Sequence, residues 1–153
     1  MKKILSLSVI AIVLLTTSCR KTIIVTPNPQ PENKITGTWY INDASFNNGN
    51  GWYSFDAGAP GIFTFNNNGT AQYSDENGNQ TGKWFSDYIS SGYYDLYANY
   101  YNDYHNDFQI KVSDNRGNYI NLYFDYIIFS GNNRFSATYY DGKNIQEYNF
   151  YRY

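Results

Sequence analysis

The pattern that most limits what this chain can fold into is an alternation of turn-forming clusters with runs rich in Tyr and Phe. The clusters consist of Asn, Asp and Gly, which adopt the positive φ angles that tight hairpin turns require. Tyr and Phe favour the pleated, half-buried surface of a β-strand. The turn clusters lie at 67–69, 76–79, 114–118, 130–133 and 141–143. The sequence therefore predicts an all-β fold of antiparallel strands joined by short turns.

The runs around these turns are the predicted strands. We expect them at 37–42, 61–66, 70–74, 82–88, 93–100, 107–113, 119–129, 134–140 and 145–152, which makes eight or nine. In the longest run the predicted core face carries Ile120, Leu122, Phe124, Tyr126 and Ile128. Such a long meander leaves unpaired edges unless it closes, so we expect an up-and-down β-barrel of about eight strands. A two-sheet sandwich is the alternative.

A tyrosine-rich stretch in the middle of the domain allows two interpretations. Tyr93, Tyr97, Tyr100 and Tyr104 follow a 4, 3, 4 spacing, which would place them on one face of an amphipathic helix. The surrounding Asn, Asp, Gly and Tyr residues are mediocre or poor helix formers. We therefore predict strand and loop in this stretch.

The first nineteen residues have the features of an export signal. Lys2 and Lys3 precede an apolar stretch at 4–15 that is too short to span a bilayer comfortably. Residues 15–19, Leu-Thr-Thr-Ser-Cys, then resemble the lipobox of bacterial lipoproteins, with Thr16 where that family usually has an aliphatic residue. The resemblance implies a signal peptide at 1–18, a lipid on Cys19, and a cell-envelope location, anchored in the outer membrane and facing the periplasm.

Residues 19–34 are predicted to tether the folded domain to this lipid anchor. Pro27, Pro29 and Pro31 alternate with other residues and favour an extended polyproline conformation. A short strand formed by Ile-Ile-Val at 23–25 is the alternative. Residues 35–153 are long enough for one domain with its own core.

The charge and the cysteine content limit the classes of partner. Cys19 is the single cysteine, so the domain has no disulfide to stabilise it. Without residues 1–18 the chain carries 9 basic and 13 acidic side chains, a formal net charge of −4. Because nucleic-acid binding depends on basic side chains that neutralise phosphates, we expect no nucleic-acid partner.

A second resemblance begins at the start of the predicted domain. Residues 35–40, Ile-Thr-Gly-Thr-Trp-Tyr, are similar to the Gly-x-Trp sequence that opens the first strand of lipocalins and lipocalin-like bacterial proteins. The stretches at 63–71 and 81–84 are similar to the second hairpin and a second Gly-x-Trp of small lipocalin-like lipoproteins. The resemblance implies a barrel in which Gly37 and Trp39 close one end and Arg152 covers the indole. Such a cation–π contact contributes about 0.5 to 2 kcal/mol.

Residues with catalytic or metal-binding chemistry are few. Asp103, His105 and Asp107 alternate, and a continuous strand would place all three on one face, as a metal site requires. The same stretch is equally typical of a polar loop, and the chain has only this one His. Motifs for nucleophilic catalysis, phosphate binding or zinc binding are not present in the sequence. We therefore predict no enzyme, no cofactor and no metal site.

The aromatic content makes a binding protein the main hypothesis. Aromatic residues are 20% of the chain, and Tyr combines an apolar ring with a hydrogen-bonding hydroxyl. We expect a membrane-anchored lipocalin-like protein that binds a small apolar or amphipathic ligand in its interior. The predicted lining residues are Phe63, Phe65, Tyr73, Tyr97, Phe124 and Tyr126. The alternative is a filled barrel that binds an envelope protein or a glycan through a tyrosine-rich surface.

Overall fold

The computed structural model describes residues 32–153 apart from 96 and 98. The predicted signal peptide at 1–18, Cys19 and most of the predicted tether therefore lie outside the described residues. The described part begins with α2 (Glu32–Ile35), a single helical turn, and continues as strands and turns. None of its helices has both the length and the apolar character that crossing a bilayer demands.

Twelve strands are present in the described residues, and all their pairings are antiparallel, which confirms the all-β prediction. They are β1 (Gly37–Asn47), β2 (Trp52–Phe55), β3 (Ile62–Phe65), β4 (Thr70–Asp75), β5 (Gly78–Phe85), β6 (Tyr88–Tyr94), β7 (Tyr100–Asn106), β8 (Phe108–Ser113), β9 (Tyr119–Phe124), β10 (Tyr126–Phe129), β11 (Arg134–Tyr140) and β12 (Ile145–Arg152). The number exceeds the prediction because β2 was not expected, the longest predicted strand is divided, and β6 and β7 form a hairpin of their own.

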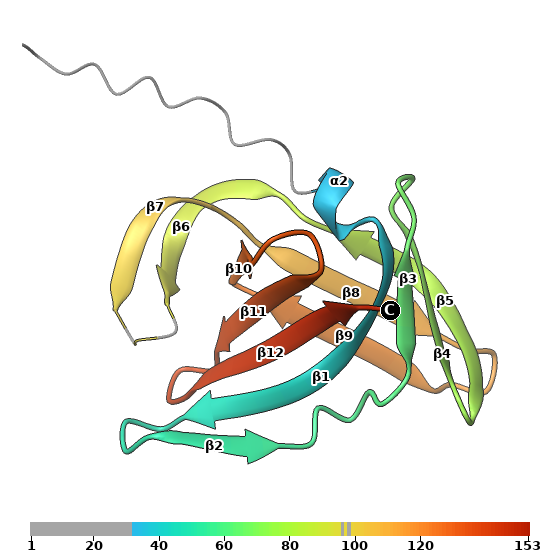
Figure 1. The fold of residues 1–153 in the computed structure, drawn as a ribbon, viewed down its shortest axis with the longest axis horizontal. Coiled ribbons are helices and arrows are strands. Elements are labelled where there is room, and N and C mark those ends of the chain that lie inside the picture. The colour runs from blue at the N-terminus through green and yellow to red at the C-terminus, as the bar shows by residue number, and fades with distance from the viewer. Residues whose placement is uncertain (1–31, 96, 98) are drawn as a thin grey trace, which may run out of the picture.

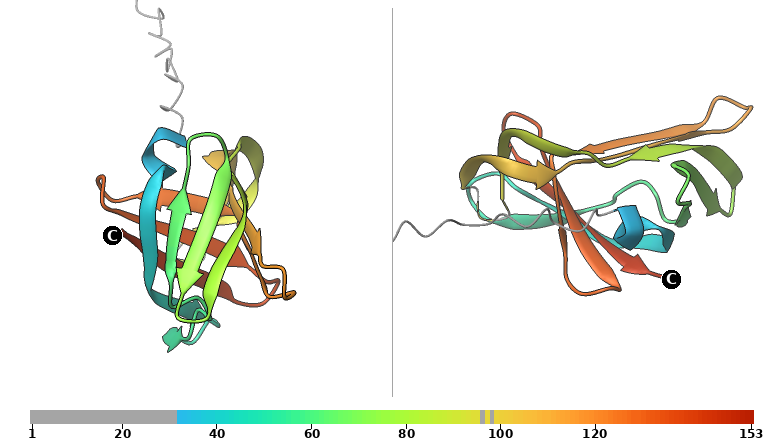
Figure 2. Two further views of the ribbon diagram at one scale, coloured as in Figure 1. Left: turned by 90° about the vertical axis from the view of Figure 1, so that its right-hand side faces the viewer. Right: turned by 90° about the horizontal axis from the view of Figure 1, so that it is seen from above.

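Ten strands form one curved sheet in the order β10-β11-β12-β1-β3-β4-β5-β8-β9, with β2 also paired to β1. β1 is long enough to pair with β3 through its first half and with β2 through its second half. The β6–β7 hairpin lies on the opposite side of the molecule from β3, β4 and β5 (Figures 1 and 2).

The pairing does not close this sheet into the predicted barrel. β9 and β10 are its two end strands, and no ladder between described residues joins one to the other. They are nevertheless consecutive in the chain, separated only by Asp125. The first part of this segment pairs with β8 and the second part with β11. The chain itself, and not strand pairing, therefore connects the two ends of the sheet.

The chain is fixed at Asp125, and this changes which side chains of β10 are buried. Ile127 is buried and Ile128 is exposed, the reverse of the predicted core face. The Asp125 N–H donates to the Thr138 carbonyl at 2.8 Å, and the Tyr140 N–H donates to the Asp125 carboxylate at 2.9 Å. Both bonds attach Asp125 to β11. The alternation of inward-facing and outward-facing side chains therefore begins again after Asp125.

The β6–β7 hairpin corrects the prediction of one strand at 93–100. β6 ends and β7 begins inside this range, and its described residues do not form the alternative helix either. The Asp95 carboxylate accepts hydrogen bonds from the N–H groups of Tyr97 and Asn99 at 2.8 and 2.9 Å. An Asp that binds main-chain groups a few residues later favours a turn, which reverses the chain here.

The core consists mainly of aromatic rings on the inner face of the sheet. Alternate residues of a strand point inward, so Phe63 and Phe65 of β3 are buried while Thr64 between them is partly exposed. The largest fully buried side chains are Trp39, Tyr73, Phe63, Phe65, Phe108, Phe124, Phe135 and Phe150. The rings of Phe135 and Phe150 are stacked, with centres 4.5 Å apart and planes 7° apart.

Arg152 covers Trp39 at one end of this core. The two residues are paired across β1 and β12, and the guanidinium carbon lies 4.3 Å from the indole ring centre. The guanidinium also donates hydrogen bonds of 3.0 to 3.2 Å to three main-chain carbonyl groups, those of Lys34, Thr36 and Asn132. Gly37 has a φ of 131°, and a Cβ there would collide with the guanidinium. The structure thus contains the contact that the lipocalin resemblance implies.

We expect Phe150→Ala to lower the free energy of unfolding by about 3 to 5 kcal/mol, because a buried ring is removed and a cavity is left. Phe85, which is about half exposed, offers the control: Phe85→Ala should cost about 1 kcal/mol or less. Urea unfolding followed by tryptophan fluorescence measures both. Equal losses in the two variants would contradict the assignment of Phe150 to the core.

We expect Arg152→Lys to lower the free energy of unfolding by about 1 to 3 kcal/mol, although the charge is kept. A lysine ammonium cannot cover the indole with a planar group and reach three carbonyls at once. Arg116→Lys is the matched control, since Arg116 is exposed and paired with Asp114, and it should change stability by less than about 1 kcal/mol. Thermal and urea unfolding of both variants test the expectation, which fails if Arg152→Lys is neutral.

Candidate functional site

The structure separates the six residues predicted to line an open interior. Four have at most 1% of their surface exposed and belong to the core: Phe63, Phe65, Tyr73 and Phe124. The ring of Phe63 lies 4.8 Å from that of Tyr73 and 5.9 Å from that of Phe65, centre to centre. These are the distances of packed aromatic pairs, so protein side chains fill the interior at these positions. Tyr97 is 82% exposed in the β6–β7 turn, and Tyr126 is half-buried on β10.

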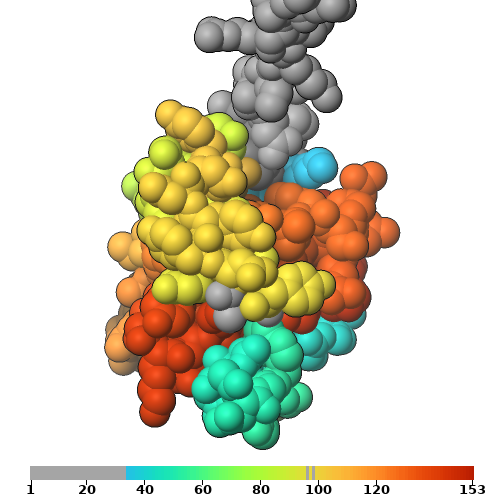
Figure 3. All heavy atoms as spheres, turned by 90° about the vertical axis from the view of Figure 1, so that its left-hand side faces the viewer, coloured from blue at the N-terminus to red at the C-terminus, as the bar shows by residue number. Residues whose placement is uncertain are grey.

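Many of the remaining tyrosines lie on the surface of the β6–β7 hairpin. Its exposed members are Tyr88, Tyr97, Tyr100, Tyr101 and Tyr104. Figure 3 shows that the hairpin, in yellow, covers a large part of one face of the molecule. The rings of Tyr88 and Tyr104 are stacked, with centres 5.4 Å apart and planes 23° apart. Each ring covers part of one face of the other, and the rest of their apolar surface is exposed.

Gly92 allows Tyr100 to lie against the hairpin backbone. A Cβ at position 92 would collide with the Tyr100 ring and hydroxyl. Tyr100 also contacts Tyr94 edge-on, with ring centres 5.3 Å apart. Only glycine leaves this space, so a side chain at position 92 would displace the Tyr100 ring.

The hairpin is attached to the large sheet through aromatic contacts. Tyr93 of β6 stacks on Tyr126 of β10, with ring centres 4.5 Å apart and planes 15° apart. On its hairpin side Tyr93 also contacts His105, at 4.3 Å. Tyr94 packs against Tyr140 of β11 at 4.3 Å. Side-chain packing, and not a β-ladder, therefore holds the hairpin beside β10.

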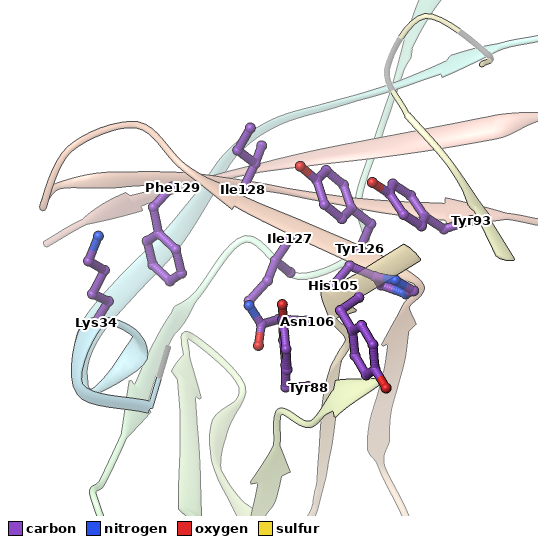
Figure 4. Close-up of a pocket in the computed structure, with 10 residues that line it drawn as sticks. Lys34, Tyr88, Tyr93, His105, Asn106, Tyr126, Ile127, Ile128 and Phe129 are labelled. Atoms are coloured by element: carbon purple, nitrogen blue, oxygen red, sulfur yellow. The ribbon is translucent and has the colours of Figure 1, made fainter. Parts of the chain in front are cut away.

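A cleft of about 350 Å³ lies between the base of the hairpin and β10. This volume is within the range of sites for small molecules. Its lining residues are Lys34, Tyr88, Tyr93, Tyr104, His105, Asn106, Tyr126, Ile127, Ile128 and Phe129. In Figure 4, Lys34 and Phe129 lie at one end, Tyr93 and Tyr126 at the other, and Asn106 between them. Apolar, aromatic and polar side chains thus share one cleft.

Two polar side chains in this cleft are buried with an unpaired atom each. His105 is 4% exposed and Asn106 is 8% exposed. The Nδ1 atom of His105 lies 3.0 Å from the carbonyl oxygen of Asp103. No described residue forms a hydrogen bond with His105 Nε2 or Asn106 Oδ1. Both atoms are themselves enclosed, so they are unpaired polar groups within the wall of the cleft.

Burial raises the pKa of several groups near the cleft. Burial, assisted by the negative charge of Asp103, raises the pKa of Tyr93 to about 12. Burial also raises the pKa of Tyr126, so both phenols are neutral at pH 7. The pKa values of Asp107 and Asp125 are raised by burial as well, while the nearby His105 opposes the rise in each. The aromatic wall therefore offers uncharged hydroxyl groups.

The alternating Asp103, His105 and Asp107 do not form a metal centre. Across residues 32–153, leaving aside 96 and 98, no three His, Cys, Asp or Glu side chains are grouped so that they could hold a metal ion. Asp103 and His105 belong to β7, which ends at Asn106. The Asp107 carboxylate instead accepts a hydrogen bond of 2.7 Å from the Asp87 N–H. The strand needed to align all three side chains is therefore too short.

The sequence predicted only Tyr126 of these cleft residues as a ligand contact. Five of the others lie on the hairpin and depend on its register, which pairs Tyr88 with Asn106 and so brings both ends of the hairpin together. The signal that could have found them is the pair Asp95 and Asn99, which flank the turn. If that turn had been recognised, the predicted strand at 93–100 would have been divided into two, and Tyr88 would have been placed opposite Asn106.

Comparison of this chain with protein-family models, with curated proteins and with solved structures finds no match. The resemblances to bacterial lipoproteins and to lipocalins therefore stay predictions from the sequence. The geometry of the cleft and the hairpin is what indicates a function for this chain.

We expect Asp125→Asn to make the protein more stable than the unchanged chain at pH 7. Burial raises the pKa of Asp125 above its ordinary 3.8, so ionisation costs more in the folded than in the unfolded state. Its contribution to stability is therefore fully present below pH 3.8 and is lost as the pH rises through the folded-state pKa. Asparagine keeps an oxygen for the Tyr140 N–H, so the advantage of the variant should grow from pH 3 to pH 7 in urea unfolding.

Asp114→Asn is the control for this pH dependence, and its effect should have the opposite sign. Hydrogen bonds, first from the Asn118 side chain, lower the pKa of Asp114 to about 2. The stability that Asp114 supplies is present above pH 3.8 and is lost as the pH falls towards 2. An Asp125→Asn variant that is equally destabilised at every pH would contradict the prediction.

Proposed function

We propose that this chain is a lipid-anchored protein of the bacterial cell envelope whose β domain binds carbohydrate at the tyrosine-rich hairpin. The observation that carries the proposal is the exposed, stacked pair Tyr88 and Tyr104 at a cleft that also holds unpaired polar atoms. A sugar ring has apolar C–H faces and a rim of hydroxyl groups. Stacked tyrosines suit the face, and polar groups suit the rim. The proposal is for a binding protein without catalytic activity.

The filled interior is the reason to place the ligand on the surface. Four of the six residues expected to line an interior site pack against other rings in the core. Carriage of a small apolar ligand in the interior would require these rings to move apart, which core packing opposes. The surface cleft needs no such rearrangement. The geometry therefore favours the surface-binding alternative over carriage inside the domain.

The same proposal includes a lipocalin-like origin for the domain. What supports it is the covering of Trp39 by Arg152 and the space that Gly37 leaves for the guanidinium. The meander order and the pairing of the first strand with the last also agree with a barrel-like arrangement. The barrel would be one that is completed by the bend at Asp125.

The anchor and the location rest on the sequence alone. The lipobox-like residues at 15–19 support lipid attachment at Cys19, and the prolines at 27–31 support an extended tether. Lys34 lines the cleft, so the tether would join the domain beside the proposed binding site. We propose attachment to the outer membrane with the domain in the periplasm, where envelope glycans are within reach.

The test is binding of the full chain, in a sugar-free detergent, to insoluble polysaccharides: peptidoglycan, chitin, cellulose and an α-glucan. We expect the Tyr88→Ala, Tyr104→Ala double variant to bind at least about tenfold more weakly, since each stacked ring contributes about 1 kcal/mol. Tyr119→Ala is the control, because Tyr119 is 75% exposed on β9, away from the hairpin.

Two results would contradict the proposed function. One is the absence of binding to every polysaccharide tested, and the other is an equal loss of binding in the Tyr119→Ala control. A third result would place the ligand in the interior instead. In that case the protein binds a fatty acid or an apolar dye tightly, Phe63→Ala changes this binding, and the double variant does not.

A further inference from the structure

One face of the β6–β7 hairpin points away from the domain and carries a row of tyrosines. Successive residues of a strand point to opposite faces, and the register pairs Tyr94 with Tyr100. The opposite face packs on the domain through Tyr93, which stacks on Tyr126. Figure 3 shows the hairpin, in yellow, uncovered on one side of the molecule. We call the following residues the outer face, and all except the half-buried Tyr94 are exposed: Tyr88, Ser90, Gly92, Tyr94, Tyr100, Asn102 and Tyr104.

The rings of the outer face follow one another along the hairpin. Tyr88 and Tyr104 are stacked at its base, with ring centres 5.4 Å apart. Nearer the turn, the end of the Tyr100 ring lies over Gly92, where a Cβ would collide with it. Tyr94 contacts Tyr100 edge-on, with ring centres 5.3 Å apart. Strand β6 rises about 20 Å between Tyr88 and Tyr94, so the row is as long as several sugar units of an extended glycan.

A second cleft, of about 420 Å³, lies at the other end of this row. Tyr94 lines it together with Tyr140 of β11, and the centres of these two rings are 4.3 Å apart. Asn48 from the turn after β1 and Lys143 from the turn after β11 also line this cleft. The outer face therefore connects the cleft at the base of the hairpin with the second cleft.

We propose that the outer face binds a linear, uncharged glycan along its length, from the cleft at the base of the hairpin to the second cleft. This inference rests on the proposed carbohydrate-binding function and names the class of ligand. The exposed rings offer surfaces for the apolar faces of sugar units, and the polar side chains of Ser90 and Asn102 lie between them. Because the units of a chain are already joined, contact with several rings raises the affinity above that for one unit.

The charges of the domain favour an uncharged glycan over an acidic one. The outer face consists of Tyr, Ser, Gly and Asn residues, which carry no charge at neutral pH. Residues 32–153 carry 7 basic and 13 acidic side chains, a formal net charge of −6, so the domain as a whole repels a polyanion. Lys34 and Lys143 each line one of the two clefts, but the outer face between the clefts has no basic side chain.

The first experiment measures how affinity depends on the length of the glycan. The full chain, in a sugar-free detergent, is titrated calorimetrically with oligomers of β-1,4-linked glucose, β-1,4-linked N-acetylglucosamine and α-1,4-linked glucose, of two, four and six units. We expect the Kd of at least one series to fall at least about tenfold from two units to six, because the longer chain also contacts Tyr100 and the second cleft. Galacturonic acid oligomers of the same lengths are the charged comparison and should bind more weakly than that series.

The second experiment removes the middle ring of the row. Tyr100→Ala should weaken binding of the six-unit oligomer at least about fivefold and leave the two-unit oligomer unaffected, since the short chain needs only the stacked pair at the base of the hairpin. Tyr100→Phe keeps the ring and should bind both oligomers as the unchanged chain does. Tyr119→Ala removes an exposed ring from β9 and is the matched control. General damage to the hairpin would weaken both oligomers, so the two-unit oligomer also reports on folding.

Each other outcome overturns a defined part of the proposal. If six units bind no more tightly than two, or if Tyr100→Ala weakens both oligomers equally, carbohydrate binding stands and the extended site is wrong. The same holds if an insoluble polysaccharide binds while none of the oligomers does. If the galacturonic acid oligomers bind most tightly, the choice of an uncharged glycan is wrong. If neither oligomers nor polysaccharides bind, both the extended site and the proposed function are wrong.

Discussion

The rest of this structure depends on the packing of aromatic rings against one another inside the curved sheet. Phe150 of β12 contacts Phe135 of β11 and Phe108 of β8, and so connects strands that are distant along the sheet. Because residues 32–153 contain no cysteine and hence no disulfide, burial of these rings has to supply most of the stability. A core made in this way has large, rigid side chains at its centre. The proposed ligand site is therefore on the outside of the domain.

The position of the cleft follows from how the sheet ends. β10 is a short end strand, and an end strand exposes main-chain groups that can pair with other chains. The β6–β7 hairpin stands beside it but is held by the rings of Tyr93 and Tyr126. Because side chains and not a ladder fill the gap between the two, a space is left at the base of the hairpin. That space is the cleft, with aromatic walls and two polar side chains.

The two ends of the domain serve different purposes in this view. At one end, the Arg152 guanidinium covers Trp39 and donates hydrogen bonds to three carbonyl groups, so the polar atoms of this side chain are satisfied. At the cleft, the free atoms of His105 and Asn106 lower stability in the absence of a partner. Satisfied polar groups stabilise a fold, and unsatisfied ones are typical of a place where a partner binds. The proposal for carbohydrate binding rests on the stacked rings of Tyr88 and Tyr104 at this cleft.

The sequence by itself determined the local structure. The all-β class and the bounds of β11 and β12 were predicted correctly, since turn clusters and alternating side chains act over a few residues. Only the tertiary structure decided that the interior is filled, that β10 buries Ile127, and that a hairpin stands over one edge of the sheet. These features depend on contacts between distant residues, such as Asp125 with Thr138 and Tyr93 with Tyr126. Neither the strand periodicity nor the turn signals specify such pairs, because each pair is fixed by how whole strands pack.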